Sequence, residues 1–130
     1  AILAKRRANL LYALERFERF APYLTTFREA PHERIGPHAL PIVVGETASF
    51  TREALARHLE EHGIAQRALF QSMPTQMPAF AYQGCGLGEF PETEYLADHG
   101  LHIGCHQDLE IAHMEYVLDT LDAFLELHQD

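Results

Sequence analysis

Lysine is almost absent from this chain of 130 residues, in which the only one is Lys5. Chemistry that runs through a Schiff base needs a lysine held in a pocket that lowers its pKa. Lys5 stands beside Arg6 and Arg7 in a stretch that predicts an exposed helix face, which is a poor place for a reactive amine. If this fold works with an aldehyde cofactor, we expect the reactive lysine to lie elsewhere.

Cysteine and long apolar stretches are also scarce. The two cysteines, Cys85 and Cys105, are too few for the disulfide framework of a small secreted protein, so we expect a reducing, cytoplasmic location. No stretch reaches the ~18 consecutive apolar residues that a membrane-spanning helix needs. The first residues also lack the charged-then-apolar order of a secretory signal. We therefore predict no membrane partner.

Positive charge is scarce as well. Ten lysines and arginines stand against 19 aspartates and glutamates, which gives a formal net charge of −9. Because a surface that binds nucleic acid needs a basic stripe to neutralise phosphates, we expect no nucleic-acid partner. The only basic cluster comprises Lys5, Arg6 and Arg7, with Arg16 and Arg19 one to two turns further on. We interpret this cluster as a solvated helix face.

What is present is the periodicity of helices within a chain whose length suits a single domain, residues 1–130. The spacing of leucines predicts a helix over residues 2–20. Thr51 as N-cap and Gly63 as a left-handed terminal residue predict a second helix between them. Asp108 is expected to cap the last, amphipathic helix.

Short stretches of strand-forming residues alternate with these helices. Four strands are predicted, over residues 23–27, 40–44, 67–70 and 101–105. Pro41 lacks a backbone N–H, so it belongs at the start or on the open side of its strand. The connections allow antiparallel neighbours. We therefore predict an α+β fold with a small antiparallel or mixed sheet of three to four strands and helices packed on one face.

Residues 71–90 predict a loop that is longer than a simple connection between two elements needs to be. Pro74 and Pro78 stiffen it, and an arginine and an aromatic residue precede it. We interpret this loop as facing something outside the 130 residues. The chain also starts within a helical pattern and without methionine, and we interpret it as a piece of a longer protein.

His102, Cys105 and His106 are the densest group of potential metal ligands. On a strand, His102 and His106 point to one face and Cys105 to the other, so a zinc site would need a sharp bend and further ligands. We favour packed or surface histidines and a buried thiol, and assign no metal residue. No serine lies in a Gly-x-Ser-x-Gly elbow, and no phosphate-binding glycine loop precedes a helix.

Several segments in succession carry a resemblance. They are residues 5–9 (KRRAN), 50–55 (FTREAL), 63–67 (GIAQR), 73–80 (MPTQMPAF), 90–96 (FPETEYL) and 101–109 (LHIGCHQDL). Their order resembles the C-terminal part of the DegT/DnrJ/EryC1/StrS aminotransferases, over essentially all 130 residues. Members of this family are mostly pyridoxal-phosphate (PLP) transaminases that act on nucleotide-linked keto-sugars in lipopolysaccharide and antibiotic biosynthesis.

The resemblance implies that an N-terminal domain, outside this sequence, carries the Schiff-base lysine and binds PLP. This chain would then bind no cofactor, hold no catalytic residue, and pack beside the active site of a homodimer. Arg67 falls on the arginine that commonly ends a Gly-Ile-x-Thr-Arg motif, with Gln66 in place of the threonine, and Phe70 on the aromatic that leads into the active-site loop. Both are implied as substrate-binding residues for a nucleotide sugar. An arginine fork can hold a phosphate or a carboxylate bidentately.

Three alternatives stay open at this point. The first is a PLP-dependent sugar dehydratase, in which a histidine replaces the lysine. The second is a non-catalytic binding module, and the third is a small metal-binding protein. The histidine that the family often has near Pro74 and Thr75 is missing here, which bears on the choice between transamination and dehydration. Arg67 could also simply pair with a surface carboxylate, where it would contribute little to stability.

Overall fold

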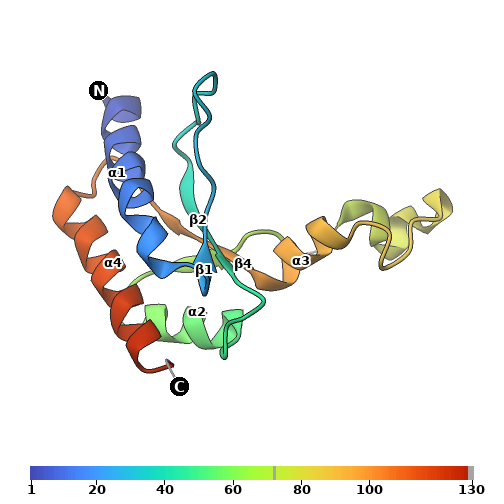
Figure 1. The fold of residues 1–130 in the computed structure, drawn as a ribbon. Coiled ribbons are helices and arrows are strands. Elements are labelled where there is room, and N and C mark those ends of the chain that lie inside the picture. Colours follow the sequence, from blue (N-terminus) through green and yellow to red (C-terminus); the bar gives the residue numbers. More distant parts are fainter. Residues whose placement is uncertain (72, 129–130) are drawn as a thin grey trace.

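A computed structural model of the chain describes residues 1–71 and 73–128. It is an α+β fold in which a four-stranded sheet is covered on one face by helices α1, α2 and α4 (Figure 1). The elements in chain order are α1 (Ile2–Arg16), η1 (Phe17–Phe20), β1 (Leu24–Thr25), β2 (Ala39–Val44), α2 (Arg52–Glu61), β3 (Gln66–Ala68), η2 (Pro74–Gln76), η3 (Pro78–Gln83), α3 (Pro91–His99), β4 (Gly100–Gly104) and α4 (Ile111–Glu126).

The sheet has the order β1-β2-β4-β3, and every neighbouring pair is antiparallel. The predicted fold class is therefore confirmed, with all four predicted strands in one sheet. Two strands are shorter than predicted. β1 has two residues, and β3 ends at Ala68, so that Phe70 lies beyond it.

Pro41 explains why β1 is short. The Thr26 hydroxyl donates a hydrogen bond of 2.6 Å to the Pro41 carbonyl. Because the N and O atoms of a strand residue point to the same side, the N–H that Pro41 lacks would also have pointed toward β1. The ladder between β1 and β2 cannot continue past this position, and a side chain supplies the bond instead. The prediction that Pro41 lies on the open side of its strand is confirmed.

The core lies between the sheet and the helices. Residues of β2 alternate between half-buried and buried, as expected for a strand with one covered face. The buried side chains of the sheet are Leu40, Ile42, Val44, Leu101 and Ile103, and those of α4 include Met114, Leu118, Leu121 and Phe124. The other face of the sheet carries the alternate residues and holds the site described below. No helix among the described residues is long and apolar enough to cross a membrane.

Local capping fixes the helix ends. The Thr51 hydroxyl accepts the Ala54 N–H at 3.2 Å, and Gly63 has a φ of +74°, so both predicted ends of α2 are confirmed. The prediction that Asp108 caps α4 is wrong. Glu110 is the N-cap, and its backbone N–H donates to His113 Nδ1 at 2.9 Å in a reciprocal capping box.

The interpretation of the basic cluster as a solvated helix face is wrong for Arg6 and Arg7. Arg6 donates to the Pro37 and His38 carbonyls at 2.9 and 2.8 Å. Arg7 Nη2 donates to both carboxylate oxygens of Glu29, at 2.7 and 2.8 Å. The long connection between β1 and β2 therefore lies along α1, where the two arginines hold it (Figure 1). A contact between segments this far apart leaves no trace in the local pattern.

Candidate functional site

Arg67 lies on β3, directly opposite His102 of β4. Its strand neighbours Gln66 and Ala68 pair with the buried Ile103 and Leu101, so alternation places Arg67 on the face of the sheet without helices. The Arg67 side chain is exposed, and within the described residues it forms no hydrogen bond and no ion pair. Its guanidinium is therefore free to meet a ligand.

A hollow of about 530 Å³ surrounds this arginine. Its lining is Arg6, His38, Ala39, Ala65, Gln66, Arg67, His102, Gly104, Cys105 and His106. We call it the cationic hollow, because its described lining includes two guanidinium groups and three imidazoles and no carboxylate. One of the imidazoles, His106, has its Nδ1 atom 3.7 Å from Oδ2 of Asp108. Such a lining is notable in a chain with a formal net charge of −9.

His102 responds to the positive surroundings of the hollow. Burial, the nearby His38 and the Arg67 guanidinium together hold the pKa of His102 below its usual range. The ring centroids of His38 and His102 are 6.1 Å apart. Arg6 fixes the backbone of His38 through the carbonyl that it binds. The hollow therefore combines a permanent charge on each arginine with the His102 imidazole, whose protonation these surroundings disfavour.

The Cys105 thiol belongs to the lining of this hollow, in surroundings that disfavour the reactive thiolate. Cys105 is buried, its Sγ is 3.7 Å from the Pro37 carbonyl, and burial raises the pKa of the thiol. Across residues 1–71 and 73–128, no three His, Cys, Asp or Glu side chains meet in a way that could hold a metal ion. His102, Cys105 and His106 therefore provide no zinc centre by themselves.

Phe70, the second predicted substrate-binding residue, does not line the cationic hollow. It is half-buried and follows the end of β3, where the chain leaves the sheet. The structure thus places Arg67 with His102 and His38, and separates it from Phe70. His102 and His38 were missed as neighbours of Arg67, because the sequence alone does not show which segments 29 to 35 residues apart lie side by side.

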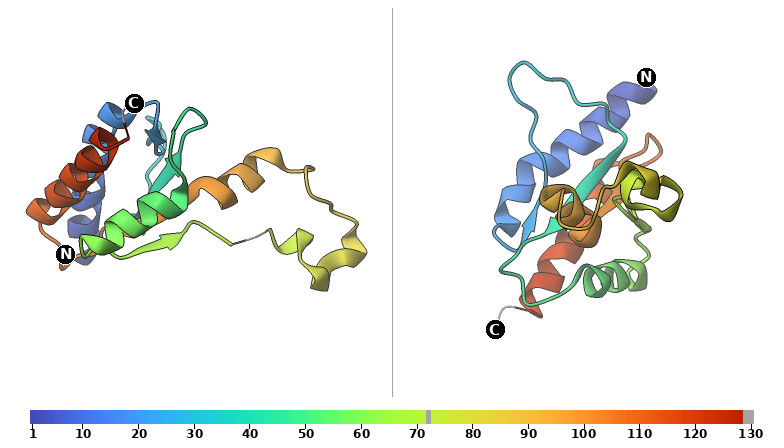
Figure 2. Two further views of the ribbon diagram at one scale, coloured as in Figure 1. Left: turned by 90° about the horizontal axis from the view of Figure 1, so that it is seen from below. Right: turned by 90° about the vertical axis from the view of Figure 1, so that its right-hand side faces the viewer.

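Beyond β3 the chain forms an arm, residues 73–90, which extends away from the body of the domain (Figures 1 and 2). Nine large apolar side chains are exposed in the described part of the chain, and five of them belong to the arm. These five are Met77, Phe80, Tyr82, Leu87 and Phe90. Concentrations of exposed apolar side chains of this kind are typical of surfaces that contact another protein.

Glu94 of α3 holds the arm in shape. Its carboxylate accepts the backbone N–H of Gly88 at 2.8 and 2.9 Å and that of Phe90 at 3.4 Å. The Gln76 amide donates to the same carboxylate and to the Gly86 carbonyl, both at 2.7 Å. The hydrogen bond from Gln76, followed by those from Gly88 and Phe90, lowers the pKa of Glu94.

We expect Glu94→Gln to loosen the arm at neutral pH. A carboxyl with a lowered pKa stabilises the folded form above its unfolded pKa of about 4.3, and this contribution is lost as the pH falls through the folded pKa. Hydrogen exchange of residues 76–90 at pH 7 should be faster in the variant than in the parent. As the pH falls through this lowered folded pKa the parent carboxylate is protonated too, so the difference should shrink.

Glu92→Gln is the matched control for this experiment. Glu92 is exposed on the same helix and makes no hydrogen bond or ion pair within the described residues. Its substitution should leave exchange in the arm unchanged. Equal exchange rates in the two variants would show that Glu94 does not organise the arm.

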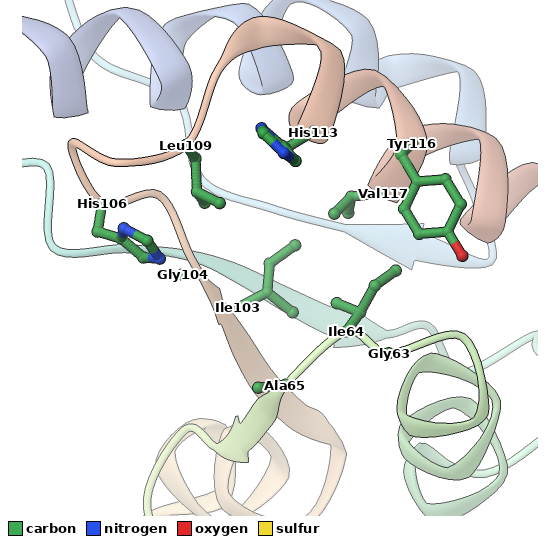
Figure 3. A pocket seen from close by; sticks show the side chains of 10 residues that line it. All are labelled: Gly63, Ile64, Ala65, Ile103, Gly104, His106, Leu109, His113, Tyr116 and Val117. Atoms are coloured by element: carbon green, nitrogen blue, oxygen red, sulfur yellow. The ribbon is translucent and has the colours of Figure 1, made fainter.

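A second hollow, of about 400 Å³, lies between α4, the end of β4 and the C-terminal end of α2 (Figure 3). Its lining is Gly63, Ile64, Ala65, Ile103, Gly104, His106, Leu109, His113, Tyr116 and Val117. The Tyr116 hydroxyl donates to the His62 carbonyl at 3.0 Å, which joins α4 to α2. Most of this lining is apolar, and it offers no nucleophile paired with a base.

The residues described here offer no lysine that fits a Schiff base with PLP. Lys5 is the only lysine of the sequence, and it is held on α1 in an ion pair with Glu110. This pair is partly open to solvent, and nothing around it desolvates the amine in the way that a Schiff-base lysine requires. No step of PLP chemistry can therefore be assigned to this chain.

Comparison with known proteins identifies the class. The same α+β fold occurs in a putative sugar aminotransferase and in sugar dehydratases whose solved structures contain PLP. The sequence profile of the DegT/DnrJ/EryC1/StrS aminotransferase family matches residues 1–122. The chain belongs to this family, as its sequence motifs predicted.

Individual relatives match nearly the whole length of this chain, but the match covers only part of each relative's own length. The lipopolysaccharide biosynthesis protein RfbH of Salmonella typhimurium is 28% identical over 129 residues, which are 95% of this chain and 29% of RfbH. A crystal structure of GDP-4-keto-6-deoxymannose-3-dehydratase has a TM-score of 0.78 at 22% identity, over 92% of this chain and 31% of the other. DesV of S. venezuelae, solved with a ketimine intermediate, has a TM-score of 0.77 at 19% identity, with coverages of 95% and 32%. The chain thus spans about a third of the length of these relatives.

Proposed function

We propose that this chain is the C-terminal domain of a PLP-dependent enzyme that acts on a nucleotide-linked keto-sugar, and that it is not catalytic alone. One observation carries the proposal: the fold matches over 92% of this chain but only 31% of a PLP-containing relative, while the single lysine is ion-paired on α1. Cofactor and reactive amine, or the histidine that replaces it, then belong to an N-terminal domain. The setting that we propose is lipopolysaccharide or polysaccharide biosynthesis.

Transfer of an amino group to the keto-sugar is the reaction that we propose first. Dehydration is the second candidate, because several structures with this fold are GDP-4-keto-6-deoxymannose-3-dehydratases. Both reactions need the same contribution from this domain, which is to bind and orient the substrate beside the cofactor. Arg67 and Phe70 are the proposed substrate-binding residues.

The arm is the surface through which this domain meets the rest of the enzyme. A free-standing binding module would not be expected to leave five large apolar side chains exposed together, and this supports the proposal over that alternative. The occupants that we propose for this surface are the N-terminal domain and the second subunit of a homodimer. The two free cysteines are consistent with the reducing cytoplasm that we propose as the location.

Labelling the 130-residue chain with PLP tests whether the reactive amine lies outside this chain. After incubation with one equivalent of PLP and reduction with borohydride, mass spectrometry should find only the slow background addition that exposed amines give. Lys5→Arg is the control, because any addition that it abolishes comes from Lys5. A stoichiometric imine on the parent, or turnover of a nucleotide keto-sugar by this chain alone, would contradict the proposal.

A further inference from the structure

We infer that three histidines at the contact between α2 and the end of α4 form a pH-sensitive clasp, which releases the end of α4 as the pH falls below neutrality. They are His58 and His62 at the end of α2 and His128 just beyond α4. The two helices contact each other, and their ends lie side by side in Figure 1. We call these histidines, together with Phe50 and Phe124, the histidine clasp.

The clasp is held together by packed rings. The centroid of the Phe124 ring lies 4.8 Å from that of Phe50, 5.0 Å from that of His58 and 4.2 Å from that of His128. The centroids of His58 and His62 are 4.2 Å apart. Phe124 is only 2% exposed, so the cluster is part of the apolar packing between the helices. Each imidazole that takes up a proton therefore brings a charge into an apolar contact.

His58 is the most sensitive member of the clasp. Its Nε2 atom is buried and has no hydrogen-bond partner in the described residues. His62 and His128 differ in this respect, because the Nδ1 of each donates to the carbonyl four residues earlier, at 2.8 Å in both cases. An unpaired buried nitrogen costs far more free energy on a charged ring than on a neutral one. Protonation of His58 therefore disfavours the closed contact.

Few groups around His58 could compensate a positive charge. From α2 these groups are His62 and Glu61, and from α4 they are His128 and the Thr120 carbonyl. Tyr116 of α4 reaches the clasp through its hydroxyl, which donates to the His62 carbonyl at 3.0 Å. The strands β3 and β4 also pack against α2, and they place uncharged residues on this face of the sheet, namely Gln66, Ala68, Leu101 and Ile103. Glu61 is thus the one carboxylate among these neighbours.

The direction of the pH effect follows from these surroundings. Burial, and after it the charge of a protonated His62, lowers the pKa of His58, and the Thr120 carbonyl and Glu61 offset only part of this. As the pH falls through the ordinary histidine pKa of about 6.5, the opened form takes up a proton before the closed form does. Acidification therefore favours the opened clasp, and the contact is strongest well above this pH.

The test is hydrogen exchange of residues 120–128 in the 130-residue chain at pH 7.5 and 5.5, expressed as protection factors. His58→Phe keeps a ring beside Phe124 and removes the titratable nitrogens. We expect the parent to lose more protection on acidification than this variant does. The excess is at most about ten-fold for every pH unit by which the folded pKa of His58 lies below the unfolded one. Equal losses in the parent and in His58→Phe would overturn the inference.

His58→Gln and His32→Gln form a matched pair of controls. His32 is exposed on the connection between β1 and β2 and forms no hydrogen bond or ion pair within the described residues. His58→Gln should reduce the loss of protection as His58→Phe does, whereas His32→Gln should lose as much as the parent. Circular dichroism at pH 7.5 verifies that each variant is folded.

NMR titration of the parent gives a readout that needs no variant. The ring signals of His58 should titrate below the ordinary value of about 6.5, and titration at or above that value would overturn the inference. Since neither measurement uses PLP or a substrate, failure of the clasp would leave the proposed function untouched. Stoichiometric PLP labelling, which would contradict the proposed function, would in turn leave the clasp untouched.

Discussion

Leu121→Ala should lower the free energy of unfolding by about 3–4 kcal/mol, the usual cost of a large-to-small change in a packed core. Leu121 is 0% exposed on α4, the helix that packs against α1, α2 and η1. The substitution removes transfer free energy and leaves a cavity that rigid neighbours on several elements cannot close. Urea denaturation gives the free-energy change directly, and thermal unfolding should show a midpoint about 10 °C lower.

Leu127→Ala is the control for this core substitution. Leu127 is 72% exposed just after the end of α4, so the same chemical change should alter the stability by less than ~0.5 kcal/mol. A Leu121→Ala protein as stable as Leu127→Ala would mean that α4 is not packed on the sheet as described.

Gly45→Ala is the second large effect, and its cause is steric. A Cβ at residue 45 would lie 2.2 Å from the Pro22 carbonyl oxygen and 3.3 Å from that of Tyr23. The two segments cannot simply separate, because the Gly45 N–H donates to the Tyr23 carbonyl at 2.8 Å. We expect a loss of about 2–3 kcal/mol from the displaced backbone, measured by the same urea denaturation.

Gly36→Ala provides the comparison at a glycine with open space. No atom lies within 4 Å of a Cβ added at residue 36. Its substitution should leave the stability unchanged or raise it by about 0.5 kcal/mol, because alanine narrows the unfolded ensemble. If both glycine variants were equally stable, the close approach of residues 22 and 45 would not hold in solution.

The two functional features of the domain lie at opposite ends of β4. The cationic hollow includes Gly104 at the end of this strand, whereas the arm leads through α3 into Gly100 at its start. A ligand in the hollow and a partner on the arm would therefore not compete for the same place. For the enzyme that we propose, substrate and partner domain would meet this chain at separate places on one rigid sheet.

Much of this fold could be predicted from the sequence. Thr51 and Gly63 limit α2 through bonds to residues three to five positions away, and the sequence shows such local chemistry directly. The helices follow from apolar residues at helical spacing, and the four strands from short stretches of strand-forming residues. Family membership follows in the same way, because it depends on the order of short motifs.

The sequence by itself therefore determined the elements, the fold class and the family. Only the tertiary structure decided what each polar side chain meets. Arg7 finds Glu29 across 22 residues, and Arg67 finds His102 through the register of two antiparallel strands. Phe70, only three residues from Arg67, is left outside their hollow because β3 ends at Ala68. Register and loop placement are set by packing of the whole chain, and no local pattern of residues contains that information.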